Sequence, residues 1–267
     1  MVKIILLISS LLLIACRNPE QTPELPAYTG PVREYFAVLD QVADDGWQSF
    51  INIFVSEDDL VSRIHFDGVT PLASSTRRNV SQTTAYFEHF GYHFYEQTDF
   101  LSQQLIGVHI TELVSLIASA KVDYLIDFDP TVFADLARLA LSAGPVVRGP
   151  YLDGAYQAFA EVDDDGYHYF VNMYILMGNI VAVHFNAVNN EGVLKYDQIL
   201  DVDGGLFAIG MQEQFEYFAQ VLIATQNPMA ITFDEDGFAT AISALHIPVE
   251  PLINLVTLAL AAGPTIE

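Results

Sequence analysis

The feature that most constrains the fold is a segment that occurs twice. Residues 44–55 read DDGWQSFINIFV, and residues 164–175 read DDGYHYFVNMYI. Beyond the shared Asp-Asp, three further pairs are identical and lie 120 positions apart: Gly46 with Gly166, Phe50 with Phe170, and Asn52 with Asn172. A unit repeated at a fixed separation indicates a duplicated structural element.

The repeat extends through the rest of both copies. The segment RIHFD at 63–67 aligns with AVHFN at 182–186, and LALSAGP at 139–145 aligns with LALAAGP at 258–264. Gly-Pro pairs at 30–31 and 149–150 open the two copies. Because the order and spacing hold throughout, we predict two homologous domains, residues 30–145 and 149–264.

Each copy begins with strand patterns and ends with helical ones. The runs FVNMYI and IVAVHF are rich in β-branched and aromatic residues, and Asp-Asp-Gly and Met177-Gly178-Asn179 are hairpin turn signals. Residues 131–144, 210–227 and 248–263 show helical patterns, the first and last of which end at glycine. The predicted fold class is therefore α+β, with two homologous domains that each consist of an antiparallel β-meander followed by helices.

The N-terminus has the pattern of a lipoprotein signal peptide. Lys3 precedes an apolar run, residues 4–14, that is too short to span a bilayer as a stable helix. The run ends in Leu-Ile-Ala-Cys, which resembles the bacterial lipobox, so residues 1–15 are the expected signal peptide and Cys16 the lipidated residue. Residues 16–29 are rich in proline and suit a tether. The expected location is the extracytoplasmic face of the cell membrane, to which the lipid on Cys16 anchors the chain.

The charge balance excludes one class of partner. The chain of 267 residues contains 10 Lys or Arg against 34 Asp or Glu, which gives a formal net charge of −24. A surface this acidic repels nucleic acid, so no nucleic-acid partner is expected. It also disfavours free anionic ligands unless local donors override the field.

The second copy resembles a known family over residues 153–197. It reads Asp-Gly-x-Tyr, then Gly-Tyr before a strand, Gly-x-Ile-x-x-Val-x-Phe, Asn-x-x-Gly and a Lys before a helix. The matching positions are Asp153, Gly154, Tyr156, Gly166, Tyr167, Gly178, Ile180, Val183, Phe185, Asn189, Gly192 and Lys195. This order resembles the FMN-binding domains of bacterial extracellular lipoproteins, some of which carry two such domains behind a lipid anchor.

The resemblance implies a flavin that relays electrons at the cell surface to redox partners there. The chain would then be an electron carrier or binding protein rather than an enzyme, with no catalytic residues. The expected FMN-binding residues are Asp153, Gly154, Tyr156, Tyr167, His184, Asn189, Lys195, Ser243 and His246. Packing inside the strands is the alternative interpretation of His184, and packing over the hairpin is that of Tyr167.

A covalent flavin is not expected. Many family members esterify the FMN phosphate to a Thr in a [Ser/Thr]-Gly-Ala-[Ser/Thr] motif before the last helix. The corresponding stretch here is Ile-Ser-Ala-Leu-His at 242–246, in which Ser243 stands at the first motif position and His246 at the acceptor position. Because the acceptor hydroxyl is missing, we predict that any FMN binds non-covalently.

We expect the second copy to bind flavin more tightly than the first. The first copy has Glu34, Tyr35 and Phe36 in the region of the Asp-Gly-x-Tyr segment, and the lysine before the second copy's helices is one of two in the mature chain. A lysine there would offset part of the negative field around a phosphate. The alternative is a cofactor-free surface lipoprotein that keeps the fold to bind a partner or another small molecule.

No metal site is expected. The acidic loops at 161–166 and 232–237 lack the glutamate that ends an EF-hand calcium loop, so turn formation is the preferred interpretation. His89 and His93 are four residues apart, which would suit two ligands on one helix face. Gly91 between them and the lack of a third ligand favour an aromatic-rich helix end instead.

Overall fold

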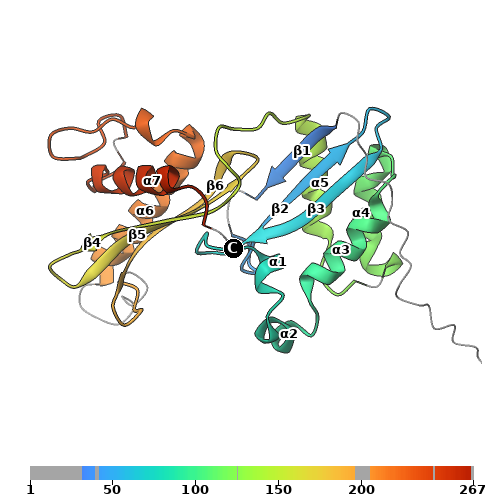
Figure 1. Cartoon of the computed structure of the whole chain (residues 1–267), viewed down its shortest axis with the longest axis horizontal. Coiled ribbons are helices and arrows are strands. Elements are labelled where there is room, and N and C mark those ends of the chain that lie inside the picture. The colour runs from blue at the N-terminus through green and yellow to red at the C-terminus, as the bar shows by residue number, and fades with distance from the viewer. Residues whose placement is uncertain (1–31, 40–41, 125, 196–204, 243, 266–267) are drawn as a thin grey trace, which may run out of the picture.

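The computed structural model describes residues 32–39, 42–124, 126–195, 205–242 and 244–265 (Figure 1). The signal peptide, Cys16 and the proline-rich segment lie outside these ranges. Two three-stranded antiparallel sheets are present, each followed by helices, which confirms the predicted α+β class and its strands-then-helices order. Within the described ranges, no helix is both long and apolar enough to cross a bilayer.

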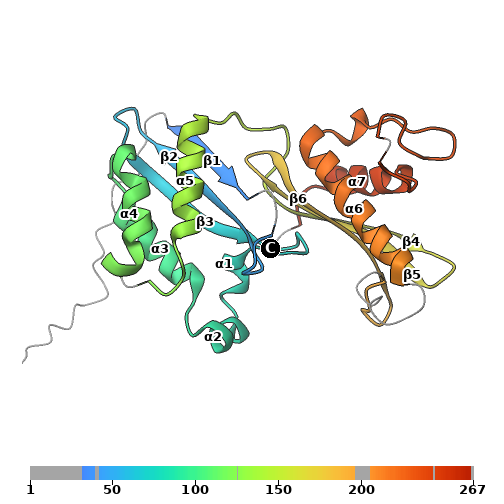
Figure 2. The ribbon, with the colours of Figure 1, turned by 180° about the vertical axis from the view of Figure 1, so that it is seen from behind.

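The first sheet is a meander of β1 (Arg33–Val38), β2 (Gln48–Val55) and β3 (Val61–Val69). Five helices follow: α1 (Arg77–Val80), α2 (Thr84–Phe90), α3 (Phe94–Leu105), α4 (Ile110–Asp123) and α5 (Thr131–Ala143). Helices α3, α4 and α5 cover one face of the sheet (Figure 2). The other face is turned toward the second domain.

The second sheet repeats the meander with β4 (Gly154–Val162), β5 (Tyr167–Leu176) and β6 (Asn179–Asn189). After it come α6 (Gly205–Thr225), the short 3-10 helix η1 (Pro228–Ala230) and α7 (Glu250–Ala262). The predicted turn between β5 and β6 consists of Met177 and Gly178, both with positive φ, 54° and 71°. Two central residues of positive φ are what a tight hairpin turn requires.

Strand register shows which residues of the two domains are equivalent. Asn52 pairs with His65 across β2 and β3, and Asn172 pairs with His184 across β5 and β6. In the first strands Tyr35 pairs with Ile53, as Tyr156 pairs with Met173. Tyr35 therefore occupies the place of Tyr156, and Arg33, which lies just before the segment Glu34–Phe36 named from the sequence, occupies that of Gly154.

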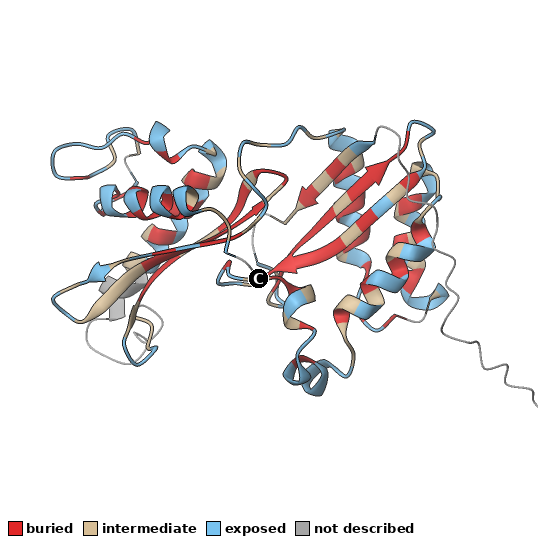
Figure 3. Cartoon of the chain, in the orientation of Figure 1, coloured by how far each residue is buried: buried red, intermediate tan, exposed pale blue. Residues whose placement is uncertain are grey.

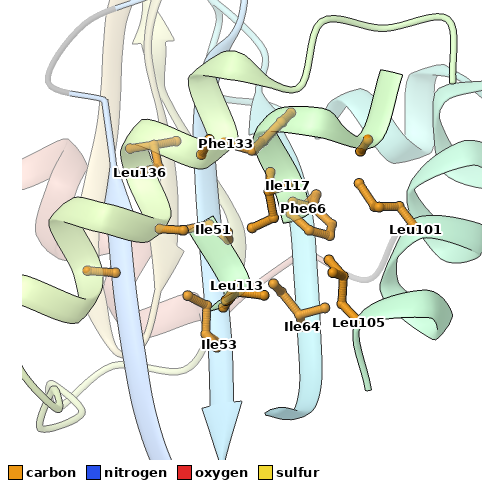
Figure 4. Packing of buried hydrophobic residues seen from close by; sticks show 14 of the residues in the cluster. Ile51, Ile53, Ile64, Phe66, Leu101, Leu105, Leu113, Ile117, Phe133 and Leu136 are labelled. Carbon is orange, nitrogen blue, oxygen red and sulfur yellow. The ribbon is translucent and has the colours of Figure 1, made fainter. Parts of the chain in front are cut away.

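Each domain has its own apolar core between its sheet and its helices (Figure 3). In the first domain, odd-numbered residues of β2 point toward the helices, where Ile51 and Ile53 are fully buried. Figure 4 shows these two residues with Ile64, Phe66 and the helical side chains that pack on them. Phe66 and Phe133 meet edge to face with ring centroids 5.4 Å apart.

A third apolar cluster joins the two domains. It contains Phe50 and Val69 from the first domain and Ala155, Tyr174 and Val181 from the second. The side chain of Gln48 crosses this boundary and donates hydrogen bonds to the carbonyl oxygens of Leu39, at 2.8 Å, and Val181, at 3.1 Å. The helix-free faces of the two sheets thus pack against each other over part of their area.

Candidate functional site

A cavity of about 470 Å³ lies beside this interdomain cluster. Alternate residues of β2 and β3 form one wall, because side chains of a strand alternate between its two faces. The linker residue Arg148 and second-domain residues around the β5–β6 turn form the other wall. The rings in the walls belong to Phe36, Phe50, Phe54, His65 and Tyr174, and the cationic side chains belong to Arg63, Arg78 and Arg148.

Two of the three arginines are held by carboxylates. Arg78 lies 2.7 Å from Asp99 and also donates to the hydroxyl of Thr98. Arg148 lies 3.3 Å from Glu34 and 3.1 Å from Asp153. Burial alone would lower the pKa of Arg148, but these two carboxylates raise it overall. Both side chains therefore link structural elements as well as lining the cavity.

Arg63 differs from these two arginines. Its guanidinium carbon lies 3.7 Å from the centroid of the Phe54 ring. No carboxylate among the described residues pairs with it. The Arg63 side chain thus carries an unneutralised positive charge into the wall of the cavity.

Asn52 contributes an unsatisfied acceptor to the same wall. Its amide nitrogen donates to the thioether sulfur of Met177, at 3.2 Å, which leaves Oδ1 shielded from solvent and, among the described residues, without a hydrogen-bond partner. The equivalent oxygen of Asn172 does have a hydrogen-bond donor, because Gln157 donates to its Oδ1 at 2.9 Å. Phe36 takes the place of Gln157 in the first domain and cannot donate. Buried acceptors of this kind are uncommon and call for an explanation.

His65 and Asp67 continue the polar row of β3. His65 Nε2 lies 3.6 Å from Asp67 Oδ2, and the His65 ring is 5.8 Å from that of Phe50. Asp67 is buried, and its Oδ1 accepts from the backbone nitrogens of Gly68 and Arg78 at 2.8 and 2.9 Å. The carboxylate of Asp67 is therefore engaged by protein donors.

The site residues predicted for the second copy lie in separate places. Asp153 lines the cavity and accepts from the backbone nitrogen of Gly178 at 2.7 Å. Gly154 is adjacent, with φ +138° and the ring of Pro264 beside its Cα. Tyr156 points into the second core, and its hydroxyl donates to the carbonyl of Leu152 at 2.8 Å.

Tyr167, Asn189 and Lys195 meet at the opposite end of the second sheet. Tyr167 pairs with Asn189 in register, and Gly154 pairs with Ile175 eight residues further along β5. At about 3.3 Å per residue this separates the two groups by roughly 25 Å. The structure therefore does not bring Asp153 and Lys195 together.

The remaining predicted residues are also dispersed. His184 lies in the middle of β6, with its ring 6.0 Å from that of Phe170. His246 is exposed, and its backbone nitrogen donates to Gln214 at 2.7 Å. Ser243 lies outside the described residues.

Lys195 is engaged by acidic residues of the β4–β5 turn. Its ammonium nitrogen lies 3.0 Å from Asp163 and 3.3 Å from Asp165, and 5.0 Å from the ring centroid of Tyr167. Burial would lower the pKa of Lys195, but the hydrogen bond to Asp163 and the other nearby charges raise it overall. This lysine therefore joins the segment after β6 to the β4–β5 turn.

The acidic loops and histidines adopt the preferred structural roles. Asp163 and Asp234 each accept two backbone hydrogen bonds within their own turns. His89 packs against Phe90 near the end of α2, and His93 directly precedes α3 as its N-cap residue, with Nδ1 2.6 Å from the carbonyl of Ser81. Among the described residues, no group of three His, Cys, Asp or Glu side chains is placed to hold a metal ion.

The sequence prediction did not include Arg63, Arg148, Phe50 or Asn52 as site residues. Their positions depend on which sheet face is left free of helices, and on how the two domains meet. A signal was nonetheless present, since Arg63, His65 and Asp67 alternate as charged or titratable residues within a strand pattern. Such alternation places all three on one face.

The comparisons with known proteins give no functional assignment. The chain matches no protein-family model, and no curated protein matches it. A solution NMR structure of a protein from Clostridium thermocellum is 28% identical, covers 43% of this chain and 94% of that chain, and has a TM-score of 0.35. A crystal structure of a protein from Clostridium perfringens is 23% identical, covers 43% of this chain and 89% of that chain, and has a TM-score of 0.30.

Proposed function

We propose that this chain is a lipid-anchored extracytoplasmic protein that binds FMN non-covalently and relays electrons to redox partners at the cell surface. The observation that supports the proposal is the interdomain cavity, with its aromatic rings and unpaired guanidinium. The sequence resemblance to FMN-binding domains names the ligand to test first. The cavity moves the proposed site from the second copy alone to the junction of the two domains.

The dimensions and chemistry of the cavity suit a planar organic anion. Its volume of about 470 Å³ falls within the range of roughly 300 to 1,000 Å³ that small-molecule sites occupy. The side chains of Phe36, Phe50 and Tyr174 offer apolar area to a ring system. In a chain of net charge −24, the unpaired Arg63 in this wall is the feature that favours a phosphate group, beside Asp67 and Asp153, which line the same cavity.

Non-covalent binding follows from the side chains available. The motif that would supply an acceptor hydroxyl before the last helix of each copy, α5 or α7, is absent from both copies. In the proposed complex Arg63 and neighbouring donors hold the phosphate, the aromatic residues hold the ring system, and Asn52 accepts from a ligand N–H. The flavin would supply the electron-carrying chemistry.

A titration of the purified full chain tests the proposal. FMN is added to the protein, and quenching or enhancement of flavin fluorescence is followed to saturation. The protein is then denatured and precipitated. We expect saturable binding with all flavin released to the supernatant. Flavin retained in the precipitate would contradict non-covalent binding, and an unchanged flavin signal would contradict flavin binding altogether.

The proposed anchor has its own test. Cys16→Ala should prevent lipid attachment, so the body is released into the medium or stays joined to its signal peptide. The measurement is fractionation of cells that express the wild-type or variant chain, followed by the apparent mass of the product. Unchanged processing and membrane retention of the variant would contradict anchoring through Cys16.

A cofactor-free surface protein is the second candidate. The ion pairs of Lys195 with Asp163 and Asp165 favour it for the second copy, because they neutralise the lysine that the resemblance assigns near the flavin. In this case the fold would serve to bind a partner or another small molecule. Absence of any flavin-dependent signal in the titration is the result that this candidate predicts.

A further inference from the structure

We infer that Arg63 is the anion-binding residue of the interdomain cavity, so that the site selects ring compounds bearing a phosphate or carboxylate over neutral analogues. The inference rests on the proposed function insofar as a ligand enters this cavity. It goes further by assigning selectivity for the charged group to one side chain of the first domain.

Arg63 stands out among the cationic side chains of the described residues. Carboxylates lie within ion-pair distance of the following six: Arg33, Arg77, Arg78, Arg138, Arg148 and Lys195. The two that lack such a partner are Arg63 and Lys121. Lys121 belongs to α4 and does not line the cavity. With 34 acidic residues in the chain, an unpaired arginine beside a cavity is well placed for an external anion.

The Phe54 ring holds the guanidinium group of Arg63 in place. Arg63 pairs with Phe54 in strand register, and the guanidinium lies over that ring at 3.7 Å. Stacking uses one face of the planar group and leaves its N–H edges for hydrogen bonds. A guanidinium edge matches two oxygens of a phosphate or carboxylate in a bidentate arrangement. Less conformational freedom is then lost when the anion binds.

Two carboxylates also line the cavity, Asp67 and Asp153, and neither forms an ion pair with Arg63. Asp153 accepts from Arg148 and from the backbone nitrogen of Gly178. Asp67 accepts from two backbone nitrogens and lies beside His65. Because protein donors already engage the oxygens of these carboxylates, the N–H edges of Arg63 stay open to an external anion, while the two negative charges remain in the wall.

The test compares single-charge variants of the full chain. Arg63→Gln removes one charge in the cavity, and Lys195→Gln removes one charge at the far end of the second sheet, so both change the net charge of the chain equally. Arg63→Lys keeps the charge without the bidentate edge. Each protein is titrated with FMN, riboflavin and inorganic pyrophosphate by calorimetry. Matching urea midpoints for Arg63→Gln and wild type establish that the exposed substitution leaves the fold intact.

We expect Arg63→Gln to weaken FMN binding about tenfold or more, as loss of a charge-assisted hydrogen bond does. Riboflavin binding should not change, Arg63→Lys should be intermediate, and Lys195→Gln should resemble wild type. Equal FMN affinity of Arg63→Gln and wild type would overturn the inference and leave flavin binding standing. Sensitivity to Lys195→Gln in place of Arg63→Gln would overturn it in favour of the second copy.

The pyrophosphate titration separates this inference from the proposed function. If wild type binds no flavin but binds pyrophosphate, and Arg63→Gln loses that binding, the anion site stands and the flavin proposal falls. If wild type binds neither flavin nor pyrophosphate, or if pyrophosphate binding is the same in Arg63→Gln, the anion site falls as well.

Discussion

The ammonium nitrogen of Lys195 lies 3.0 Å from a carboxylate oxygen of Asp163, and this ion pair ties the end of the second sheet to its β4–β5 turn. Asp163 also accepts from the backbone nitrogen of Tyr167 at 2.8 Å. The hydrogen bond from Tyr167, followed by that from Lys195, holds the pKa of Asp163 below its ordinary value. The contribution of this ion pair to the stability of the fold should therefore depend on pH.

Asp163→Asn should lower the stability of the chain near neutral pH and lose its effect in acid. A depressed folded-state pKa means that the ionised carboxylate stabilises the fold above its unfolded pKa, and that this contribution disappears as pH falls through the folded value. The measurement is the urea midpoint of wild type and variant between neutral pH and about pH 3. A difference that stays constant over this range would contradict the ionic role.

The two positive-φ glycines of the second meander should respond differently to alanine. Gly166, at φ +84°, has open space where a Cβ would be, so Gly166→Ala should cost only the backbone strain of about 1 to 2 kcal/mol. Gly154, at φ +138°, would place its Cβ 2.9 Å from that of Pro264. Gly154→Ala should therefore destabilise more than Gly166→Ala in chemical denaturation. Equal costs would show that the Pro264 contact is unimportant.

Phe66→Ala should destabilise the first domain by about 3 to 5 kcal/mol, the usual cost of removing a buried phenylalanine. Phe66 is fully buried and its ring packs against that of Phe133, so its removal leaves a cavity inside the core. Phe87 is a matched control, because it is 47% exposed and Phe87→Ala should have little effect. The check is the free energy of unfolding in urea, and similar values for the two variants would contradict the assigned core.

Gln48→Leu should weaken the coupling between the domains. The substitution leaves the carbonyl oxygens of Leu39 and Val181 without the donor that bridges them, at a cost of about 1 to 3 kcal/mol. The unfolding transition should broaden or split as the two domains separate thermodynamically. Gln157→Leu removes a hydrogen bond within the second domain and should keep the transition shape. A single sharp transition for Gln48→Leu would contradict its bridging role.

Much of each domain could be predicted from the sequence, because the determining signals are local. Asp-Asp-Gly and Met177-Gly178-Asn179 specify hairpins through residues that tolerate positive φ, and the observed turns occur there. The helical patterns near residues 131–144 and 248–263 correspond to α5 and α7. Because the sequence repeats, the meander predicted for one copy is also predicted for the other.

The candidate site could not be predicted in the same way. β2 carries large apolar residues on both faces, and such a strand pattern does not show whether its second face meets helices or another sheet. Here that face meets the second domain through Phe50 and Tyr174. The role of Arg63 depends on which carboxylates reach it, a property of tertiary structure. That Arg33 is the equivalent of Gly154 is likewise fixed by strand register, because the two residues themselves are not alike.

Locating bound FMN by NMR most directly tests the claim that the interdomain cavity is the ligand site. Backbone amide signals of the isotope-labelled full chain are assigned and followed as FMN is added. We predict the largest shift changes at Asn52, Arg63, His65 and Met177, with the hairpin at 163–167 and Lys195 nearly unchanged. Shift changes concentrated at that hairpin and Lys195, with the cavity residues unaffected, would contradict the account.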